Sequence, residues 1–259
     1  MSAVSGLSEP LIQQFNRDGY LQLRGAVSEH LCSQVAAVVQ SHLDPLVGPV
    51  EYEADVGYPG APGSRTDQGG KTPRRLLHAY ARHSCFGELA GHRLVVDYLS
   101  TLMQAPVVLS QSHHNCVMTK HPGFSSATAW HQDIRYWSFD RPELITAWFA
   151  LGPELRQNGA LRVIPGTHTV DFDRGALDRD LFLRPELPEN KQLIRQAVDV
   201  DLEQGDVLLF HCRLFHAAGK NRSADVKLSP VFTYHAAHNQ PIPGTRSAAL
   251  PGIPMSVGD

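Results

Sequence analysis

The sequence predicts a mainly β fold with flanking helices, in which two facing sheets form a double-stranded β-helix, or cupin-like jelly roll. Two observations predict this class. After residue 107, glycine, proline and asparagine separate short apolar and β-branched segments, as in an antiparallel sandwich. Helical periodicity is concentrated before residue 104. Because 259 residues is a usual length for one β-rich domain, we expect a single domain over residues 1–259.

Residues 8–104 are expected to form helical support for the sheets. A helix should begin after Ser8, a typical N-cap residue, and end at Asp18-Gly19. A strand is predicted at 20–23, a second helix after Ser28, and a third helix at 86–103 from the helical spacing of apolar residues.

Residues 51–73 contain so many glycines and prolines that they predict no regular structure. A long irregular loop inside a compact domain is either a lid over a binding site or disordered, and we interpret this one as a lid. Arg74 and Arg75 follow directly. They are either a solvated basic pair or a source of an always-charged donor for an anion in a pocket.

The jelly-roll core is expected at about 105–235, with an irregular tail at 240–259. A partly helical crossover is predicted at 168–196. The expected strands of the core are 107–120, 127–136, 144–151, 160–164, 197–202, 206–211, 213–217 and 227–235.

The segment around His131 and Asp133 is the strongest candidate for a functional site. On an extended strand, residues i and i+2 point to the same face, so these two side chains can aim at one point. An imidazole and a carboxylate are two of the three ligands in the 2-His-1-carboxylate site of non-haem Fe(II). The pair is common by chance, so the prediction requires a second histidine far along the chain.

Two histidines compete for that third position. His211 ends the strand expected at 206–211, and His216 stands before small residues that allow close approach. Five residues separate them, which would place them on opposite faces of one continuous strand.

Several short motifs occur in order along the chain, over roughly residues 13–235. Together they resemble those of the phytanoyl-CoA dioxygenase-like (PhyH) family of Fe(II)/2-oxoglutarate oxygenases. The motifs are Trp130-His131-Gln132-Asp133, Asn158-Gly159-Ala160-Leu161, Ile164-Pro165-Gly166-Thr167-His168, Gly205-Asp206, and His216 with Asn221-x-Ser223.

The resemblance implies that His131, Asp133 and His216 are the catalytic metal ligands, because His216 matches the family's distal histidine. It further implies Fe(II), the cosubstrate 2-oxoglutarate and O2 as cofactors. The expected reaction hydroxylates an unactivated carbon of a small molecule and releases succinate and CO2. Related halogenases lack the carboxylate ligand, so Asp133 favours hydroxylation.

The resemblance also assigns cosubstrate-binding residues. The family usually has an arginine eleven residues after the distal histidine, but Lys227 stands there, and Ala218 replaces a frequent serine. Lys227 is either an ordinary surface lysine or a point charge that replaces the arginine. Trp148 matches a position beside the cosubstrate, although a core tryptophan is the alternative, and Arg75 is a looser match.

For the substrate, we expect contacts from His114 and Arg74. His113 and His114 lie on a predicted strand, where only one can face the cavity, and the resemblance favours His114. The basic candidates near the cavity are Arg74, Arg75 and Lys120, while His114 can take either charge state, and they predict a substrate that carries a carboxylate or phosphate-type anion. The sequence does not identify that substrate.

Composition excludes other classes. A net charge of −3 gives no indication of a nucleic-acid or membrane surface, and no apolar run is long enough for a membrane span. Four cysteines without a CxxC pair and an N-terminus without signal-peptide features predict reduced thiols and a cytoplasmic location. The oligomeric state, monomer or homodimer, stays open.

The alternative function is a metal-binding cupin-like protein without oxygenase activity, such as an isomerase or ligand sensor.

Overall fold

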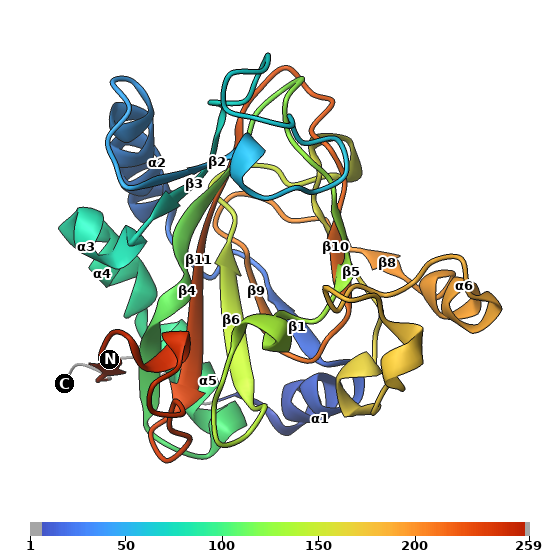
Figure 1. Cartoon of the computed structure of the whole chain (residues 1–259). Coiled ribbons are helices and arrows are strands. Elements are labelled where there is room, and N and C mark those ends of the chain that lie inside the picture. Colours follow the sequence, from blue (N-terminus) through green and yellow to red (C-terminus); the bar gives the residue numbers. More distant parts are fainter. Residues whose placement is uncertain (1–6, 257–259) are drawn as a thin grey trace.

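The computed structural model describes residues 7–256, so the first six residues, on which the expectation of no secretory signal rests, and the last three tail residues lie outside the described part. Within it, two antiparallel sheets face each other, and helices cover the outside (Figure 1). The larger sheet has eight strands in the order β1-β9-β6-β11-β4-β3-β2, with β12 paired to β4. The smaller sheet has the order β5-β10-β7-β8. The predicted mainly β class is therefore confirmed.

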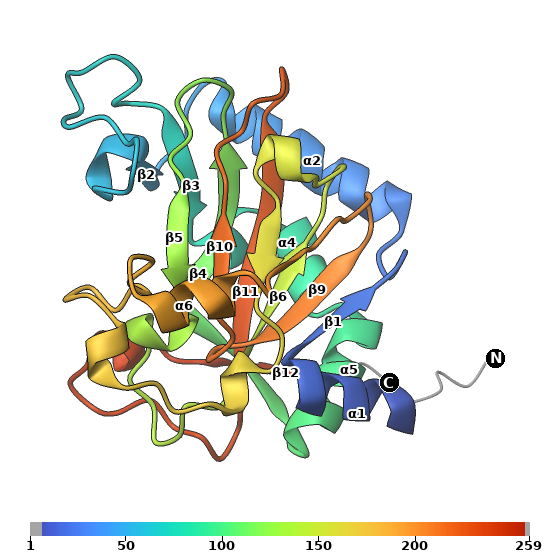
Figure 2. The ribbon, with the colours of Figure 1, turned by 90° about the vertical axis from the view of Figure 1, so that its right-hand side faces the viewer.

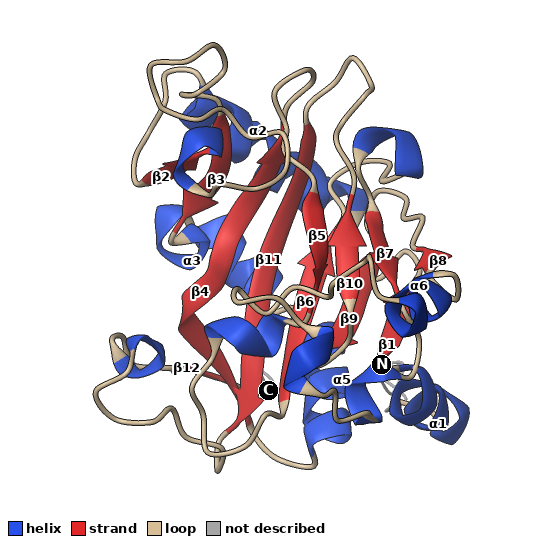
Figure 3. Ribbon diagram, turned by 45° about the vertical axis from the view of Figure 1, so that its right-hand side comes forward, coloured by secondary structure: helices blue, strands red, loops and turns tan. Residues whose placement is uncertain are grey.

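The strands of the described chain differ widely in length, and β4 and β11 form the long central pair of the larger sheet (Figure 3). Their bounds are β1 Tyr20–Leu23, β2 Val50–Tyr52, β3 Pro73–Leu77, β4 Val107–Lys120, β5 Thr128–His131, β6 Leu144–Phe149, β7 Leu161–Val163, β8 Val198–Asp199, β9 Val207–His211, β10 His216–Ala218, β11 Lys227–Ala236 and β12 Ile253–Met255.

Five helices precede β4, and one lies in the crossover before β8. They are α1 Glu9–Asp18, α2 Glu29–Leu43, α3 Ala79–Arg82, α4 Ser84–Ala90, α5 Arg93–Met103 and α6 Pro188–Ile194. The helix α1 begins after Ser8 and ends at Gly19, whose positive φ of 82° only glycine adopts freely. These ends match the prediction.

One apolar cluster joins the helices to the larger sheet. Phe86 of α4 and Leu99 of α5 pack with Phe232 and Tyr234 of β11 there, all fully buried. A second cluster lies between the two sheets, where Trp148, Leu208 and Phe210 meet Leu161 and Val163. Helix α6 lies outside the smaller sheet (Figure 2). The helices therefore brace one face of the larger sheet and leave its other face for the space between the sheets.

Several sequence predictions need correction. The strands expected at 197–202 and 213–217 are observed only as β8 and β10, and the tail expected to be irregular contains β12. The third helix, expected at 86–103, is two helices, because the chain turns at Gly91 between α4 and α5. The loop at 51–73 is not wholly irregular, since β2 extends to Tyr52 and a 3₁₀ helix spans Glu53–Asp55. The strand expected at 127–136 ends at His131. The short strands β2, β3 and β12 were not predicted.

A bulge in β4 sets the direction of its histidines. The β4–β11 ladder changes register between Phe232 and Thr233, which pair with Asn115 and Ser110, and His113 inside the bulge has a φ of 58°. Extra residues on one strand re-aim the side chains that follow. His114, Met118 and Lys120 consequently face the space between the sheets.

Among residues 7–256, the helices are too short or too polar to cross a lipid bilayer.

Candidate metal centre and active site

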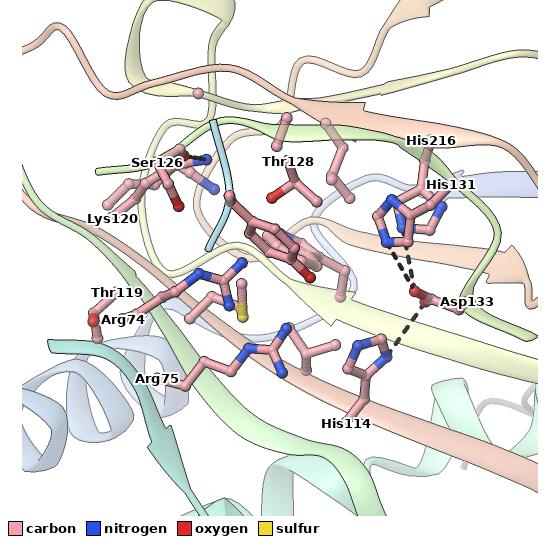
Figure 4. A pocket seen from close by; sticks show the side chains of 18 of the residues that line it. Arg74, Arg75, His114, Thr119, Lys120, Ser126, Thr128, His131, Asp133 and His216 are labelled. Atoms are coloured by element: carbon pink, nitrogen blue, oxygen red, sulfur yellow. Dashed lines mark hydrogen bonds and ion pairs between the residues drawn. The ribbon is translucent and has the colours of Figure 1, made fainter. Parts of the chain in front are cut away.

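Three buried side chains from three segments meet between the sheets (Figure 4). His131 ends β5, His216 begins β10, and the two residues are register partners in one antiparallel ladder. Asp133 begins the 3₁₀ helix Asp133–Tyr136. The Nε2 atoms of both histidines lie 3.4 Å from Asp133 Oδ1. The structure thus brings together the three residues that the sequence predicts as metal ligands.

The local backbone explains how Asp133 reaches this point. Gln132 is still extended, with φ −106° and ψ 136°, so the carboxylate stays on the same side as His131. The chain then turns, and the backbone N–H of Ile134 donates to the carbonyl of Cys212 at 2.9 Å. The side-chain amide of Gln132 donates to the Arg213 carbonyl. The alternation of side chains along an extended backbone therefore holds for His131 and Asp133, although strand β5 ends at His131.

Hydrogen bonds fix how each imidazole is presented. The Nδ1 of His131 donates to the carbonyl of Ala129 at 2.9 Å, and the Nδ1 of His216 donates to that of Leu214 at 3.0 Å. These bonds leave both Nε2 lone pairs free to face Asp133. Metal-ligating histidines characteristically donate their other ring nitrogen in this way.

A metal ion would compensate the buried carboxylate of Asp133. Asp133 is fully buried, and neither of its oxygens accepts a hydrogen bond from any described residue. An unpaired buried carboxylate is costly unless a cation compensates it. For metal–ligand distances of about 2.1 Å, neighbouring ligands of an octahedron are about 3 Å apart, which is close to the observed spacing. The residues fit a divalent metal ion.

Electrostatics favour the protonation states that metal binding requires at His131 and Asp133, whereas at His216 the carboxylate of Asp133 outweighs burial and raises the pKa. Burial, helped by His216, lowers the pKa of His131 to about 4, so its Nε2 carries no proton. Burial alone would raise the pKa of Asp133, but the charges of His114 and His216 outweigh it and hold that pKa well below its usual range. A neutral imidazole and an ionised carboxylate are metal ligands without further proton loss.

The three side chains close one end of a cavity between the sheets, with about 710 Å³ of empty space, part of it open to solvent. All eight residues that the sequence proposes for the site line this cavity. Besides the three ligand candidates, these are Arg74, Arg75, His114, Trp148 and Lys227.

Comparison with known families decides the relationship. The model of the family described as Phytanoyl-CoA dioxygenase (PhyH) matches residues 15–229. The chain belongs to the phytanoyl-CoA dioxygenase family. The resemblance predicted from its motifs is confirmed.

Curated relatives of this family match the chain in part. The probable phytanoyl-CoA dioxygenase of Caenorhabditis elegans is 29% identical over 146 residues, which cover 50% of this chain and 44% of that protein. The peroxisomal phytanoyl-CoA dioxygenase of Homo sapiens is 31% identical over 121 residues, 42% of this chain and 35% of that protein. The matched regions therefore span less than half the length of these relatives.

Solved structures extend the comparison to the fold. EctD from S. alaskensis with bound Fe superposes with a TM-score of 0.75 at 20% identity, covering 93% of this chain and 81% of that one. The epimerase SnoN in complex with Fe3+, alpha ketoglutarate and nogalamycin RO gives 0.73 at 23% identity, covering 97% and 96%. At these identities the likeness shows the fold, a jelly roll as predicted.

At the end of the cavity remote from the metal ligands, this family member departs from the expected pattern. Lys227 is buried, so the alternative of an ordinary surface lysine is wrong. Its Nζ lies 2.7 Å from Glu154 Oε2 and 3.2 Å from Ser229 Oγ. Trp148 donates its indole N–H to the same carboxylate at 2.9 and 3.0 Å. Trp148 is therefore both a core residue and a cavity wall.

The sequence analysis did not identify Glu154. This carboxylate comes from the loop after β6 and lies 73 residues from Lys227. No local motif marks the pair, and only its tertiary contact reveals it. The one sequence signal is a loop glutamate between apolar neighbours, Pro153 and Leu155, because such a residue needs a cation partner if it is buried.

The other side of the cavity carries the substrate candidates. His114 Nδ1 lies 3.3 Å from Asp133 Oδ2, so this histidine, which the sequence analysis assigns to the substrate, contacts a candidate metal ligand. Arg74 and Arg75 share Glu51, at 2.9 and 3.3 Å. Figure 4 shows the Arg75 guanidinium pointing toward His114.

Two tyrosines that the sequence analysis missed border this side. Tyr58 comes from the loop at 51–73, and its hydroxyl lies 2.9 Å from that of Tyr136, in the 3₁₀ helix that Asp133 begins. Arg74 stacks on the Tyr58 ring at 4.8 Å. The loop thus reaches across to the segment that carries the candidate metal ligand.

His211 lies outside this site. It ends β9, its ring is 5.3 Å from that of His168, and its Nδ1 accepts the backbone N–H of Arg213 at 3.1 Å. We therefore expect His216→Ala to lose stoichiometric iron and His211→Ala to retain it. Metal analysis of both purified variants, with unfolding curves as a control for folding, checks this. Iron retained in His216→Ala but lost in His211→Ala would reverse the assignment.

Proposed function

We propose that this protein is an Fe(II)- and 2-oxoglutarate-dependent dioxygenase. It hydroxylates an unactivated carbon of a small, anionic organic substrate and releases succinate and CO2. The observation that carries the proposal is the buried group of His131, Asp133 and His216 at the end of a cavity lined by basic side chains. Membership of the phytanoyl-CoA dioxygenase family supports the same reaction.

In this proposal the three side chains hold the metal and leave three adjacent positions for the reactants. When bound, the metal, 2-oxoglutarate and O2 together supply the oxidising power for breaking a C–H bond. The carbonyls of Ala129 and Leu214 keep both imidazoles in one orientation through their Nδ1–H bonds. His114 Nδ1 lies 3.3 Å from Asp133 Oδ2, where its charge favours the ionised form of the carboxylate.

The apolar part of the cavity wall excludes water around the reacting groups. Leu161, Phe210 and Val231 line it and belong to the cluster between the sheets. A dry cavity protects an oxidising intermediate from side reactions and strengthens the electrostatic contacts inside it.

Arg75 supports the anionic substrate class. Its guanidinium is largely buried, and its Nε lies 3.3 Å from Glu51 Oε1 in an ion pair without hydrogen-bond geometry. The charge of Glu51 raises its pKa despite burial, so it stays cationic. Arg75 lies on the same side as His114, and we assign both to substrate with Arg74. An anionic group would complete the hydrogen bonds of this buried fork.

Stoichiometry tests the proposed reaction. Iron-loaded protein with 2-oxoglutarate should consume O2 and form succinate and CO2 in equal amounts, and the rate should rise with the true substrate. A panel of carboxylates and phosphates matched with neutral and cationic analogues tests the substrate class. Metal binding without any succinate would instead support the cupin-like isomerase or sensor. If neutral or cationic compounds alone increased the rate of succinate formation, the proposal of an anionic substrate would be wrong.

Closure of the loop at 51–73 is a further expected result. Tyr58 reaches Tyr136, and the backbone N–H of Ala127 donates to the Pro59 carbonyl at 3.2 Å, so few bonds hold the loop over the site. We expect protease to cut this loop, and 2-oxoglutarate with substrate to suppress cleavage at least about fivefold. Tyr58→Phe, which loses only the hydroxyl contact, should weaken the protection. Equal cleavage with and without ligands would contradict closure.

The cytoplasmic location and the oligomeric state stay predictions. Cys32, Cys85, Cys116 and Cys212 are free and buried, as expected for reduced thiols. The matching human relative is named as peroxisomal.

A further inference from the structure

Two lysines lie side by side at the end of the cavity remote from the metal ligands. Lys120 ends β4, Lys227 begins β11, and they are register partners in the antiparallel ladder. Directly paired residues present their side chains on the same face, and both line the cavity. The family pattern assigns the carboxylate of the cosubstrate to Lys227. The contacts of the two ammonium groups differ in a way that changes this assignment.

Lys227 is already paired with the carboxylate of Glu154. Glu154 and Ser229 accept from its Nζ, and Ser229 donates to Glu154 Oε1 at 2.6 Å. With the indole N–H of Trp148, this network satisfies both oxygens of a carboxylate that is only 1% exposed. The ion pair is neutral as a whole. A second carboxylate arriving at Lys227 would therefore gain little net attraction and would lie beside Glu154.

Lys120 has no such partner. Its Nζ donates to the carbonyl of Ser126 at 3.3 Å, and no carboxylate of residues 7–256 forms an ion pair with it. Burial, with the nearby charges of Lys227 and Arg74, lowers the pKa of Lys120 to about 7. A partly buried ammonium in a cavity wall, with one weak acceptor, is under-satisfied, and an incoming anion would compensate it.

The chain also holds the Lys120 side chain in position. Gly159 has a φ of 78°, and a Cβ there would lie 2.8 Å from Lys120 Cδ and 3.0 Å from Cε. The Asn158-Gly159 turn therefore packs directly against the methylene stem. Asn221 donates to the Lys120 carbonyl at 2.7 Å and fixes the backbone behind it. The Asn158-Gly159 and Asn221-x-Ser223 motifs thus both position Lys120. Its ammonium group is held in the wall of the cavity.

We propose that Lys120 supplies the charge that binds the carboxylate of 2-oxoglutarate remote from the metal, while Lys227 forms a structural ion pair with Glu154. This inference rests on the proposed function, because it names a binding residue for the same cosubstrate. Lys120 acts as a binding residue and takes no part in the chemistry at the metal.

The test is a binding measurement without turnover. Iron-loaded protein under nitrogen is titrated calorimetrically with 2-oxoglutarate and with 2-oxopentanoate, which has a methyl group in place of the remote carboxylate. Wild-type protein should prefer 2-oxoglutarate at least tenfold. Lys120→Met keeps the stem and removes the charge, so it should reduce this preference to less than threefold. The exposed Lys191→Met on α6 is the matched control and should behave as wild type.

The paired lysine gives the opposite expectation. Lys227→Met/Glu154→Gln removes both charges together and should keep at least a fivefold preference for 2-oxoglutarate. A preference that survives Lys120→Met, or one lost in the double variant, would overturn the proposal. If wild-type protein binds neither acid, the proposed function fails instead, and if it binds both equally, only the charge-based anchor fails. The two failures are therefore distinguishable.

A pH series adds an independent readout. Lys227 and Arg74 face Lys120 as cations, and Glu53 and Glu154 are the nearby acids. Only the protonated amine attracts a carboxylate, and its population falls as pH rises through about 7. The Kd of 2-oxoglutarate should therefore increase about tenfold or more from pH 6.5 to 8.5. This increase should vanish in Lys120→Met and persist in the double variant. A slope unchanged in Lys120→Met would contradict the assignment.

Discussion

Asp133→Ala is expected to abolish iron binding and succinate formation while the protein stays folded. The carboxylate is fully buried, it contacts both candidate histidine ligands at 3.4 Å, and its oxygens hold no hydrogen bonds that the fold would lose. Its removal leaves two imidazoles, which bind a divalent metal far more weakly than the complete set of three. We expect less than about a tenth of the wild-type iron content and activity at the detection limit.

Metal analysis, succinate formation and thermal unfolding of the metal-free proteins measure these effects. The melting temperature of metal-free Asp133→Ala should stay within about 5 °C of wild type, since no apolar packing is removed. Asp180→Ala, an exposed carboxylate on the surface, serves as the matched control. Asp133→Ala protein that retained one iron per chain and normal succinate formation would show that the carboxylate is not a ligand.

The sequence predicts the metal centre well because its geometry depends on local rules. His131 and Asp133 are two residues apart, so an extended Gln132 is sufficient to aim both at one point. His216 reaches them because it is the register partner of His131 in the β5–β10 ladder. His211 and His216 are separated by a turn in which Leu214 donates back to the His211 carbonyl at 2.9 Å. The choice between them therefore followed from the family match rather than from strand parity.

Other features depend on contacts that local patterns do not encode. The strand expected at 127–136 ends early because Asp133 starts a helical turn, and Ile134, Tyr136 and Trp137 fit either conformation. Tyr58 joins the site through a loop whose composition predicts only irregularity. The partner of Lys227 is a glutamate 73 residues earlier, and it has no motif of its own. Residue pairs so far apart in the sequence can be recognised only from the three-dimensional arrangement of the strands.

The second large expected effect concerns the ion pair of Lys227 and Glu154. Lys227→Met alone is expected to lower the free energy of unfolding by about 3–5 kcal/mol, because it leaves the Glu154 carboxylate buried without its cation. Trp148 and Ser229 still donate to Glu154, but two neutral donors do not replace a charge in an apolar site. Urea unfolding of the metal-free protein, followed by far-ultraviolet circular dichroism, measures the loss.

The double variant Lys227→Met/Glu154→Gln separates the cost of the isolated charge from the cost of losing the lysine. Glutamine keeps an acceptor for Trp148, so the double variant should recover to within about 2 kcal/mol of wild type. In Lys227→Met the destabilisation comes from the ionised form of the isolated Glu154 carboxylate. Its destabilising effect is then small below about pH 4, where the acid is neutral in both states, and grows as pH rises toward neutral. A Lys227→Met protein as stable as wild type at pH 7.5, or a deficit independent of pH, would show that Glu154 does not depend on Lys227 for its charge.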